Sequence, residues 1–127
     1  MKTRAINAAG TPAAVGGYSQ AVEVTGATRR LYISGQIPMA ADGIVPGTFA
    51  EQAVLTWANV KAQLGAADMD VRNLVKVTIF LSDRRFAAEN RAARQDALGG
   101  HAPALTVIIT GIFDDAWLLE IEAVAEA

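Results

Sequence analysis

The sequence predicts a single α+β domain, residues 1–127, in which two helices pack on one face of a mixed β-sheet. Three observations lead to this fold class. A chain of 127 residues suffices for one compact domain and is too short for two of ordinary size. Hydrophobic residues make up 52% of the chain and charged residues 19%, which excludes intrinsic disorder. The hydrophobic pattern also alternates between the period of a strand and that of a helix.

Three β segments are expected before the first helix, and the pattern locates two of them. Residues 19–24 and 30–34 are short runs that favour strands, and the turn Thr25-Gly26-Ala27-Thr28 between them predicts a hairpin. Residues 40–47 contain two glycine turns and are expected to form a loop.

The first helix is predicted to begin after Thr48, because Thr48 and Glu51 have the spacing of a capping box. It is predicted to end at Gly65. Between these points, residues recur at helical spacing at Ala53, Val54, Trp57, Val60, Lys61 and Leu64.

The second half of the chain predicts a strand, a more polar helix and two further strands. Residues 74–81 are rich in β-branched and aromatic residues, which favours a buried strand. Residues 86–98 are expected to form the second helix, which ends at Gly99-Gly100. The last strands are expected at 104–110 and 117–125, around a turn at Asp114-Asp115.

The long strands carry apolar residues on both faces, which predicts self-association. In the strand at 74–81, Leu74 and Phe80 are expected on the face opposite Val77 and Ile79, and Ile108 is expected on that opposite face in the next strand. Two helices can cover only one face, and an uncovered apolar face of this size is unusual in a monomer. We therefore expect a homo-oligomer in which a second copy covers it.

Charge and composition exclude several classes of partner. The net charge is −2 and the pI about 5.3, which argues against broad binding to nucleic acid or to anionic membranes. The arginines at 84, 85, 91 and 94 lack interleaved aromatic residues, so we interpret them as a solvated helix face. No apolar stretch is long enough to cross a membrane and no signal peptide is evident. The absence of cysteine fits a cytoplasmic location.

Glu120 is the strongest candidate for chemistry. Glu120 and Glu122 are two residues apart in a predicted strand and therefore point to the same face. A carboxylate beside buried apolar surface is paired, hydrogen-bonded or protonated. Glu120 is therefore either a general acid–base facing a pocket at a subunit boundary, or an edge-strand glutamate in water or in an interface ion pair. His101, the single histidine, is expected in a turn, and no metal site is expected because no second imidazole or thiolate exists.

A set of short motifs spread over the whole chain carries a family resemblance. The motifs are Gly17-Tyr18-Ser19-Gln20, Ser34-Gly35-Gln36-Ile37-Pro38, Asn59-Val60, the segment 75–81, Asn90, Pro103-Ala104 and Glu120-Ile121-Glu122-Ala123. In this order and with this spacing they closely resemble the reactive-intermediate deaminase family (Rid, YjgF or UK114). The resemblance implies a chorismate-mutase-like α+β fold and a homotrimer with small-molecule clefts between subunits.

The resemblance also implies an activity and a set of site residues. The family's deaminases hydrolyse enamines and imines derived from amino acids, without a metal or cofactor, to 2-oxo acids and ammonia. By resemblance, Glu120 would position or activate the attacking water and Gly35 would offer a backbone amide. Tyr18 would line the cleft and Asn90 would help to close it. Ser34 and Thr106 complete the set of substrate-binding candidates.

One position departs from the family pattern. The deaminases have Pro-x-Arg-Ser where this chain has Pro103-Ala104-Leu105-Thr106, so the arginine that holds the substrate carboxylate is replaced by Leu105. A deaminase with a non-standard substrate is therefore expected, with a preference for neutral or cationic compounds. The alternative is a non-catalytic binding or regulatory trimer. Whether Arg91 or Arg94 supplies the missing charge from another position stays open, because nothing in the sequence places either of them there.

Overall fold

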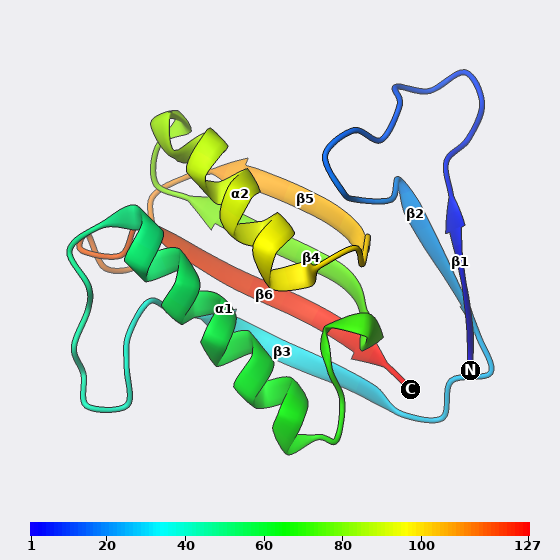
Figure 1. Cartoon of the computed structure of the whole chain (residues 1–127), viewed down its shortest axis with the longest axis horizontal. Coiled ribbons are helices and arrows are strands. Elements are labelled where there is room, and N and C mark those ends of the chain that lie inside the picture. The colour runs from blue at the N-terminus through cyan, green and yellow to red at the C-terminus, as the bar shows by residue number, and fades with distance from the viewer.

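A four-stranded mixed sheet with two helices on one face forms the body of the chain (Figure 1). The computed structural model describes all residues, 1–127. The helices are α1 (Phe49–Ala66) and α2 (Ala87–Leu98), with short 3-10 turns at Val71–Asn73 and Arg84–Phe86. The strands are β1 (Lys2–Ile6), β2 (Ala21–Thr25), β3 (Arg30–Gln36), β4 (Leu74–Leu81), β5 (Ala104–Ile109) and β6 (Leu119–Glu126). The predicted α+β fold, with both helices on one face of a mixed sheet, is confirmed.

The strand order of the sheet is β3-β6-β4-β5. The last strand, β6, lies between β3 and β4 and is antiparallel to both. The crossover through α2 makes β5 parallel to β4, with Val77 opposite Leu105. The register of the β3–β6 ladder shifts between Ile33 and Gln36, so the backbone is irregular at Ser34-Gly35.

The core lies between the helices and the sheet. Val77, Ile79 and Ile121 are fully buried beneath α1, which contributes Trp57 and Leu64. A Thr48 side chain that caps α1 confirms the predicted start, whereas the helix runs past Gly65 to Ala66. Val54, predicted on the apolar side of α1, is instead 65% exposed.

The helix-free face of the sheet is less apolar than the alternation predicted. A register shift after Leu74 pairs this residue with Ala125, so Leu74 is buried in the core instead of lying on the open face with Phe80. The side chains on the open face include Tyr32, Ser34, Thr78 and Glu122, all of them at least partly accessible. The face is therefore uncovered, as predicted, but of mixed polarity.

The predicted hairpin between residues 19–24 and 30–34 is wrong. Strand β2 pairs with β1, at the N-terminus, and the two form a separate arm beside the sheet (Figure 1). The reason is competition for backbone partners: after the Gly26 turn, Thr28 and Arg29 bond to Ala127 at the end of β6. That long-range pairing draws β3 away from β2. The β1 strand is the segment that the sequence pattern did not locate.

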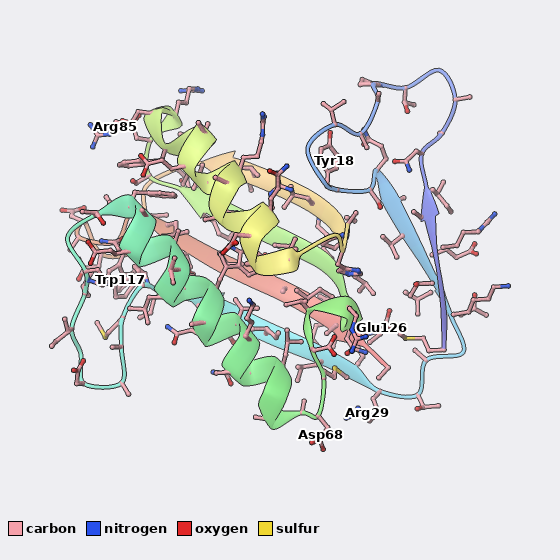
Figure 2. The ribbon with its side chains drawn as sticks, in the orientation of Figure 1. Tyr18, Arg29, Asp68, Arg85, Trp117 and Glu126 are labelled. Carbon is pink, nitrogen blue, oxygen red and sulfur yellow. The ribbon has the colours of Figure 1, made fainter.

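The loop between β1 and β2 is fixed to the start of β5. The backbone of Ser19 donates to the Pro103 carbonyl at 3.0 Å, and its hydroxyl donates to the Ala102 carbonyl at 2.6 Å. Gly16 and Gly17, just before, have φ values of +100° and +80°, a conformation that glycine adopts without strain. These contacts bring Tyr18 to the side of the loop that faces α2 and β5 (Figure 2).

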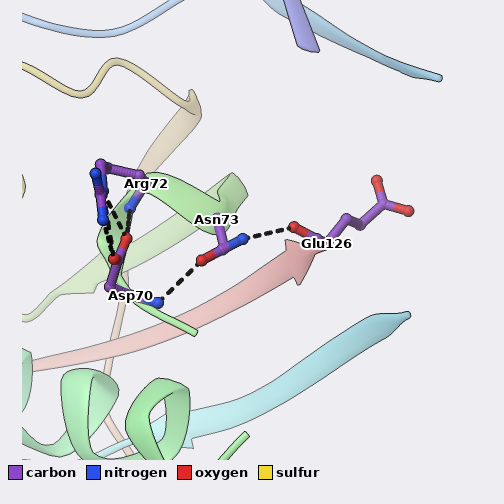
Figure 3. A network of polar contacts seen from close by, with 4 residues as sticks. All are labelled: Asp70, Arg72, Asn73 and Glu126. Carbon is purple, nitrogen blue, oxygen red and sulfur yellow. Dashed lines mark hydrogen bonds and ion pairs between the residues drawn. The ribbon is translucent and has the colours of Figure 1, made fainter. Parts of the chain in front are cut away.

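A polar network ties the turn before β4 to the end of β6 (Figure 3). Asp70 caps this turn and pairs with Arg72 at 2.6 Å, and Asn73 accepts from the Asp70 amide at 3.0 Å. The Asn73 side chain then donates to the Glu126 carbonyl at 3.0 Å. The network holds two neighbouring strands in register at their ends.

The Asp70–Arg72 pair predicts a pH-dependent contribution to stability. The hydrogen bond from the Arg72 side chain lowers the pKa of Asp70 from 3.8 to about 2. The folded state therefore binds fewer protons than the unfolded state between these values, and the contribution, present above pH 4, is lost as the pH falls toward 2. Asp70→Asn keeps the cap but loses the charge, so its deficit in melting temperature should be visible at pH 5 and much smaller at pH 2. A deficit that is equal at both pH values would contradict this assignment.

Candidate functional site

Glu120 and Gly35 form the first part of the candidate site. Glu120 is the second residue of β6 and points to the helix-free face, because its neighbours Leu119 and Ile121 are buried in the core. Its cross-strand partner is Phe80. The half-buried Glu120 carboxylate belongs to none of the chain's ion pairs. A carboxylate without a cationic partner in this setting is available to a ligand or to water.

Gly35 lies directly under the Glu120 side chain. A Cβ atom on residue 35 would be 2.8 Å from Glu120 Cδ and 3.1 Å from Cγ, and still closer to a carboxylate oxygen. Glycine is required here for space, since residue 35 has no positive φ. The structure therefore brings together two of the predicted site residues through the irregular pairing of β3 with β6.

Two polar residues of α1 support this part of the site, and the sequence reasoning gave neither a role. Buried Gln52 accepts from the Leu118 amide at 2.8 Å and donates to the Ala116 carbonyl at 3.0 Å, which fixes the entry into β6. Asn59 donates to the carbonyls of Ile37 and Met39, just after Gly35. The sequence feature that could have revealed them is the occurrence of polar residues at helical spacing within an otherwise apolar helix.

Tyr18, Asn90 and Leu105 belong to a second part of the candidate site. Asn90 lies on α2 and is 4% exposed, although an asparagine on a polar helix is normally solvated. Its Oδ1 atom is buried and has no hydrogen-bond partner. Half-buried Leu105 follows Ala104, which bridges to Ser19, and Leu105 packs against the core on the helix-covered face. Tyr18 is half-buried in the β1–β2 loop and lies close enough to Arg94 on α2 to affect its pKa.

The interpretation of the arginines as a solvated face is wrong for Arg94. Arg85, in the 3-10 turn before α2, does project outward (Figure 2). Arg94 is 4% exposed, because the Gly16–Gly17 loop covers it and accepts a hydrogen bond from Nη1 at 2.8 Å to the Gly16 carbonyl. Arg94 lies one turn after Asn90 on the same side of α2. The burial was not visible in the sequence, because it depends on a loop more than 70 residues away in the chain.

Ser34 and Thr106 lie on the helix-free face. Ser34 lines a shallow groove on that face together with Tyr32, Lys76 and Glu122. The Thr106 hydroxyl accepts from Lys76 Nζ at 2.6 Å. This groove contains none of Tyr18, Asn90, Leu105 or Glu120. The open face therefore holds Ser34, Gly35, Thr106 and Glu120, whereas Tyr18, Asn90 and Leu105 lie on the other side of the sheet.

A single chain does not bring the two parts of the site together. Glu120 points away from the helices, while Asn90 and Arg94 lie on a helix that covers the opposite face. Two groups that are to act on one small molecule must both reach it, so the parts meet only if one copy of the chain lies against another. No group of three or more histidine, aspartate or glutamate side chains is arranged to hold a metal ion.

None of the helices has the length and apolar character needed to cross a membrane.

Comparison with known proteins identifies the family. The family model described as Endoribonuclease L-PSP matches residues 8–127. A 2-iminobutanoate/2-iminopropanoate deaminase from Capra hircus is 38% identical over 125 residues, which covers 96% of this chain and 88% of that protein. The Homo sapiens protein of the same name is also 38% identical, with the same coverage.

Solved structures agree with the sequence comparison. YyfB from Yersinia pestis, of the conserved Rid protein family, has a TM-score of 0.88 and 26% identity, with full coverage of both chains. E. coli TdcF with bound serine has a TM-score of 0.72 and 30% identity, with 98% of each chain covered. The fold and the site thus define an α+β protein of the Rid class. The chain belongs to the Endoribonuclease L-PSP family, which is the Rid family that its motifs resemble.

Proposed function

We propose that this chain is an enamine/imine deaminase that releases ammonia by hydrolysis of a C–N bond. The observation that carries the proposal is the position of the Glu120 carboxylate, half-buried beside Gly35 and free of any ion pair. Relatives that are 38% identical are named as imine deaminases, which supports the same reaction class. Ammonia release from a panel of imines generated in solution tests the proposal directly.

The reaction needs water as its only co-reactant. Glu120 accepts a proton from a water molecule while the water oxygen bonds to the imine carbon. The proton then passes to the nitrogen, which gives a carbinolamine. The hydroxyl proton of this intermediate moves to the nitrogen by way of Glu120 as the C–N bond breaks, and an oxo compound and ammonia leave. In this proposal the Gly35 backbone amide donates to the reacting group, and Asn90 and Tyr18 hold the molecule from the other side of the cleft. No step requires a metal or an organic cofactor.

We propose further that the working form is a homotrimer with its sites between subunits. The separation of the two parts of the site across the sheet supports this arrangement, as does the sheet face that no helix covers. Light scattering should give three times the chain mass of 13.3 kDa. The absence of cysteine and the low net charge support an action in the cytoplasm on a small molecule, and not on nucleic acid.

Mixing two inactive variants tests whether a site is shared. Glu120→Gln removes one part of the site and Asn90→Ala the other, so each pure variant should be inactive. In trimers assembled from equal amounts, about a quarter of the clefts should pair an intact Glu120 with an intact Asn90, and that share of activity should return. Mixed trimers that stay inactive, although the wild-type chain is active and each variant folds, would place the whole site in one subunit.

A non-catalytic binding or regulatory trimer is the alternative, and the replacement of the family arginine by Leu105 favours it. Such a protein would bind a small molecule in the same cleft but release no ammonia from any imine. If the chain is an enzyme, the same replacement means that residue 105 does not hold a substrate carboxylate, because leucine offers no charge-assisted hydrogen bond.

A further inference from the structure

The Gly16–Gly17 loop and α2 enclose a positive charge that has no acidic partner. Arg94 Nη1 donates to the Gly16 carbonyl at 2.8 Å and has a longer contact of 3.5 Å with the Gly17 carbonyl. Arg94 Nε is buried with no partner. The ion pairs of the chain all involve other arginines, at positions 4, 30 and 72. Burial thus removes water from this guanidinium, and no negative charge of the chain replaces it.

A second arginine increases the positive potential at this point. Arg91 Nε would be 3.6 Å from a Cβ atom on Gly16, so the Arg91 side chain runs along the same loop. Burial lowers the pKa of Arg94, the neighbouring Arg91 lowers it further, and Tyr18 opposes both effects. Two cations side by side, next to a tyrosine, make a local field that favours an anion.

Asn90 adds an unpaired acceptor to this unpaired donor. Asn90 and Arg94 are one helical turn apart on the same side of α2, and each is 4% exposed. Asn90 Oδ1 and Arg94 Nε are both buried without partners. A molecule that satisfies both must present a strong acceptor to Arg94 and an N–H donor to Asn90, one helical turn away. A carboxylate next to an imine or amine nitrogen has this pattern.

We propose that Arg94 binds the carboxylate of an imino- or amino-acid-derived ligand, with Asn90 accepting from the ligand's N–H group. Arg94 thereby supplies, from α2, the cation that is missing at Leu105 on β5. The inference rests on the proposed function, since it names the substrate class of the same cleft. It differs from the expected preference for neutral or cationic ligands, which followed from the loss of the arginine at Leu105 and left open whether Arg91 or Arg94 supplies the charge.

Calorimetric binding of 2-oxobutanoate and of its uncharged amide tests the proposal without turnover. The wild-type chain should bind the carboxylate more tightly than the amide, and more weakly as salt is added. Arg94→Gln should weaken carboxylate binding about 30-fold or more and leave amide binding nearly unchanged. Arg94→Lys keeps the charge, so its affinity for the carboxylate should lie between those of the wild-type chain and Arg94→Gln. Equal carboxylate binding by Arg94→Gln and wild type would overturn the assignment.

Two further variants separate charge from loop structure. Ser19→Ala removes another anchor of the Tyr18 loop but keeps the guanidinium, so it should preserve the preference for carboxylate over amide. Loss of that preference in Ser19→Ala, to the extent seen in Arg94→Gln, would show that the loop and not the charge is responsible. Leu105→Arg, added to Arg94→Gln, should restore carboxylate binding by returning a cation to this side of the sheet.

The outcomes also distinguish this proposal from the proposed function. Carboxylate binding that depends on Arg94, without ammonia release from any imine, would support the assignment of Arg94 and refute the deaminase. Ammonia release from imino acids that is unchanged in Arg94→Gln would support the deaminase and overturn the role of Arg94.

Discussion

Replacement of Glu120 by glutamine is expected to lower the rate of C–N hydrolysis by about 10²–10⁴-fold, the usual contribution of a general acid–base. Glutamine has nearly the same shape as glutamate and keeps its hydrogen-bonding ability, but it cannot take a proton from water. Because the Glu120 carboxylate is part of no ion pair, the melting temperature and the assembly should change little.

Glu122→Gln is the matched control for this experiment. Glu122 lies on the same strand and the same face, opposite Thr78, and is exposed on the open face of the sheet. Its substitution should leave ammonia release close to the wild-type rate. A Glu120→Gln protein that is much less stable yet fully active would instead show that Glu120 is a structural ion-pair partner between subunits.

Gly35→Ala is expected to reduce activity by about 10²-fold, because a shift of the catalytic group by about 1 Å is enough to do so. The new methyl group would lie 2.8 Å from Glu120 Cδ, far inside the contact distance of two carbon atoms. The Glu120 side chain can rotate away from the methyl group. We therefore expect the substitution to displace the carboxylate but to change the melting temperature little.

The measurement compares kcat and melting temperature for Gly35→Ala and Gly111→Ala. A Cβ atom on Gly111 meets nothing within 4 Å, so this control should match the wild-type chain in both quantities. Full activity of Gly35→Ala would mean that the Glu120 carboxylate need not stay above residue 35. Glu120 would then act from another position than the one described here.

The sequence predicted best those elements whose signal is local. The strand at 74–81 was predicted with its observed limits, because a run of β-branched and aromatic residues marks a buried strand on its own. The start of α1 was predicted from Thr48 and Glu51, which lie within one turn of each other. The hairpin failed because the partner of β3 is β6, about 90 residues further along the chain, and no local pattern encodes that pairing.

The same distinction between local signals and distant contacts applies to the residues of the candidate site. The motifs pointed to Glu120 and Gly35 as separate candidates, but their contact depends on the irregular β3–β6 register. The burial of Arg94 was missed, because an arginine on a polar helix is normally solvated and only the distant glycine loop covers it. Gln52 was missed because its partners, Ala116 and Leu118, lie more than 60 residues away.

The central place of β6 in the sheet has a consequence for how the chain is made. On the ribosome, β3, α1, β4, α2 and β5 are all synthesised before β6, and β3 has no partner in the sheet until β6 arrives. Val77 and Ile79 of β4 are fully buried in the folded chain. Until β6 is synthesised, they therefore lie next to an unpaired edge of β4. Pairings as distant as Arg30 with Glu126 also make folding slow relative to helical proteins of this size. A nascent chain stalled before residue 119 should thus engage chaperones, and completion of β6 should release it in one cooperative step.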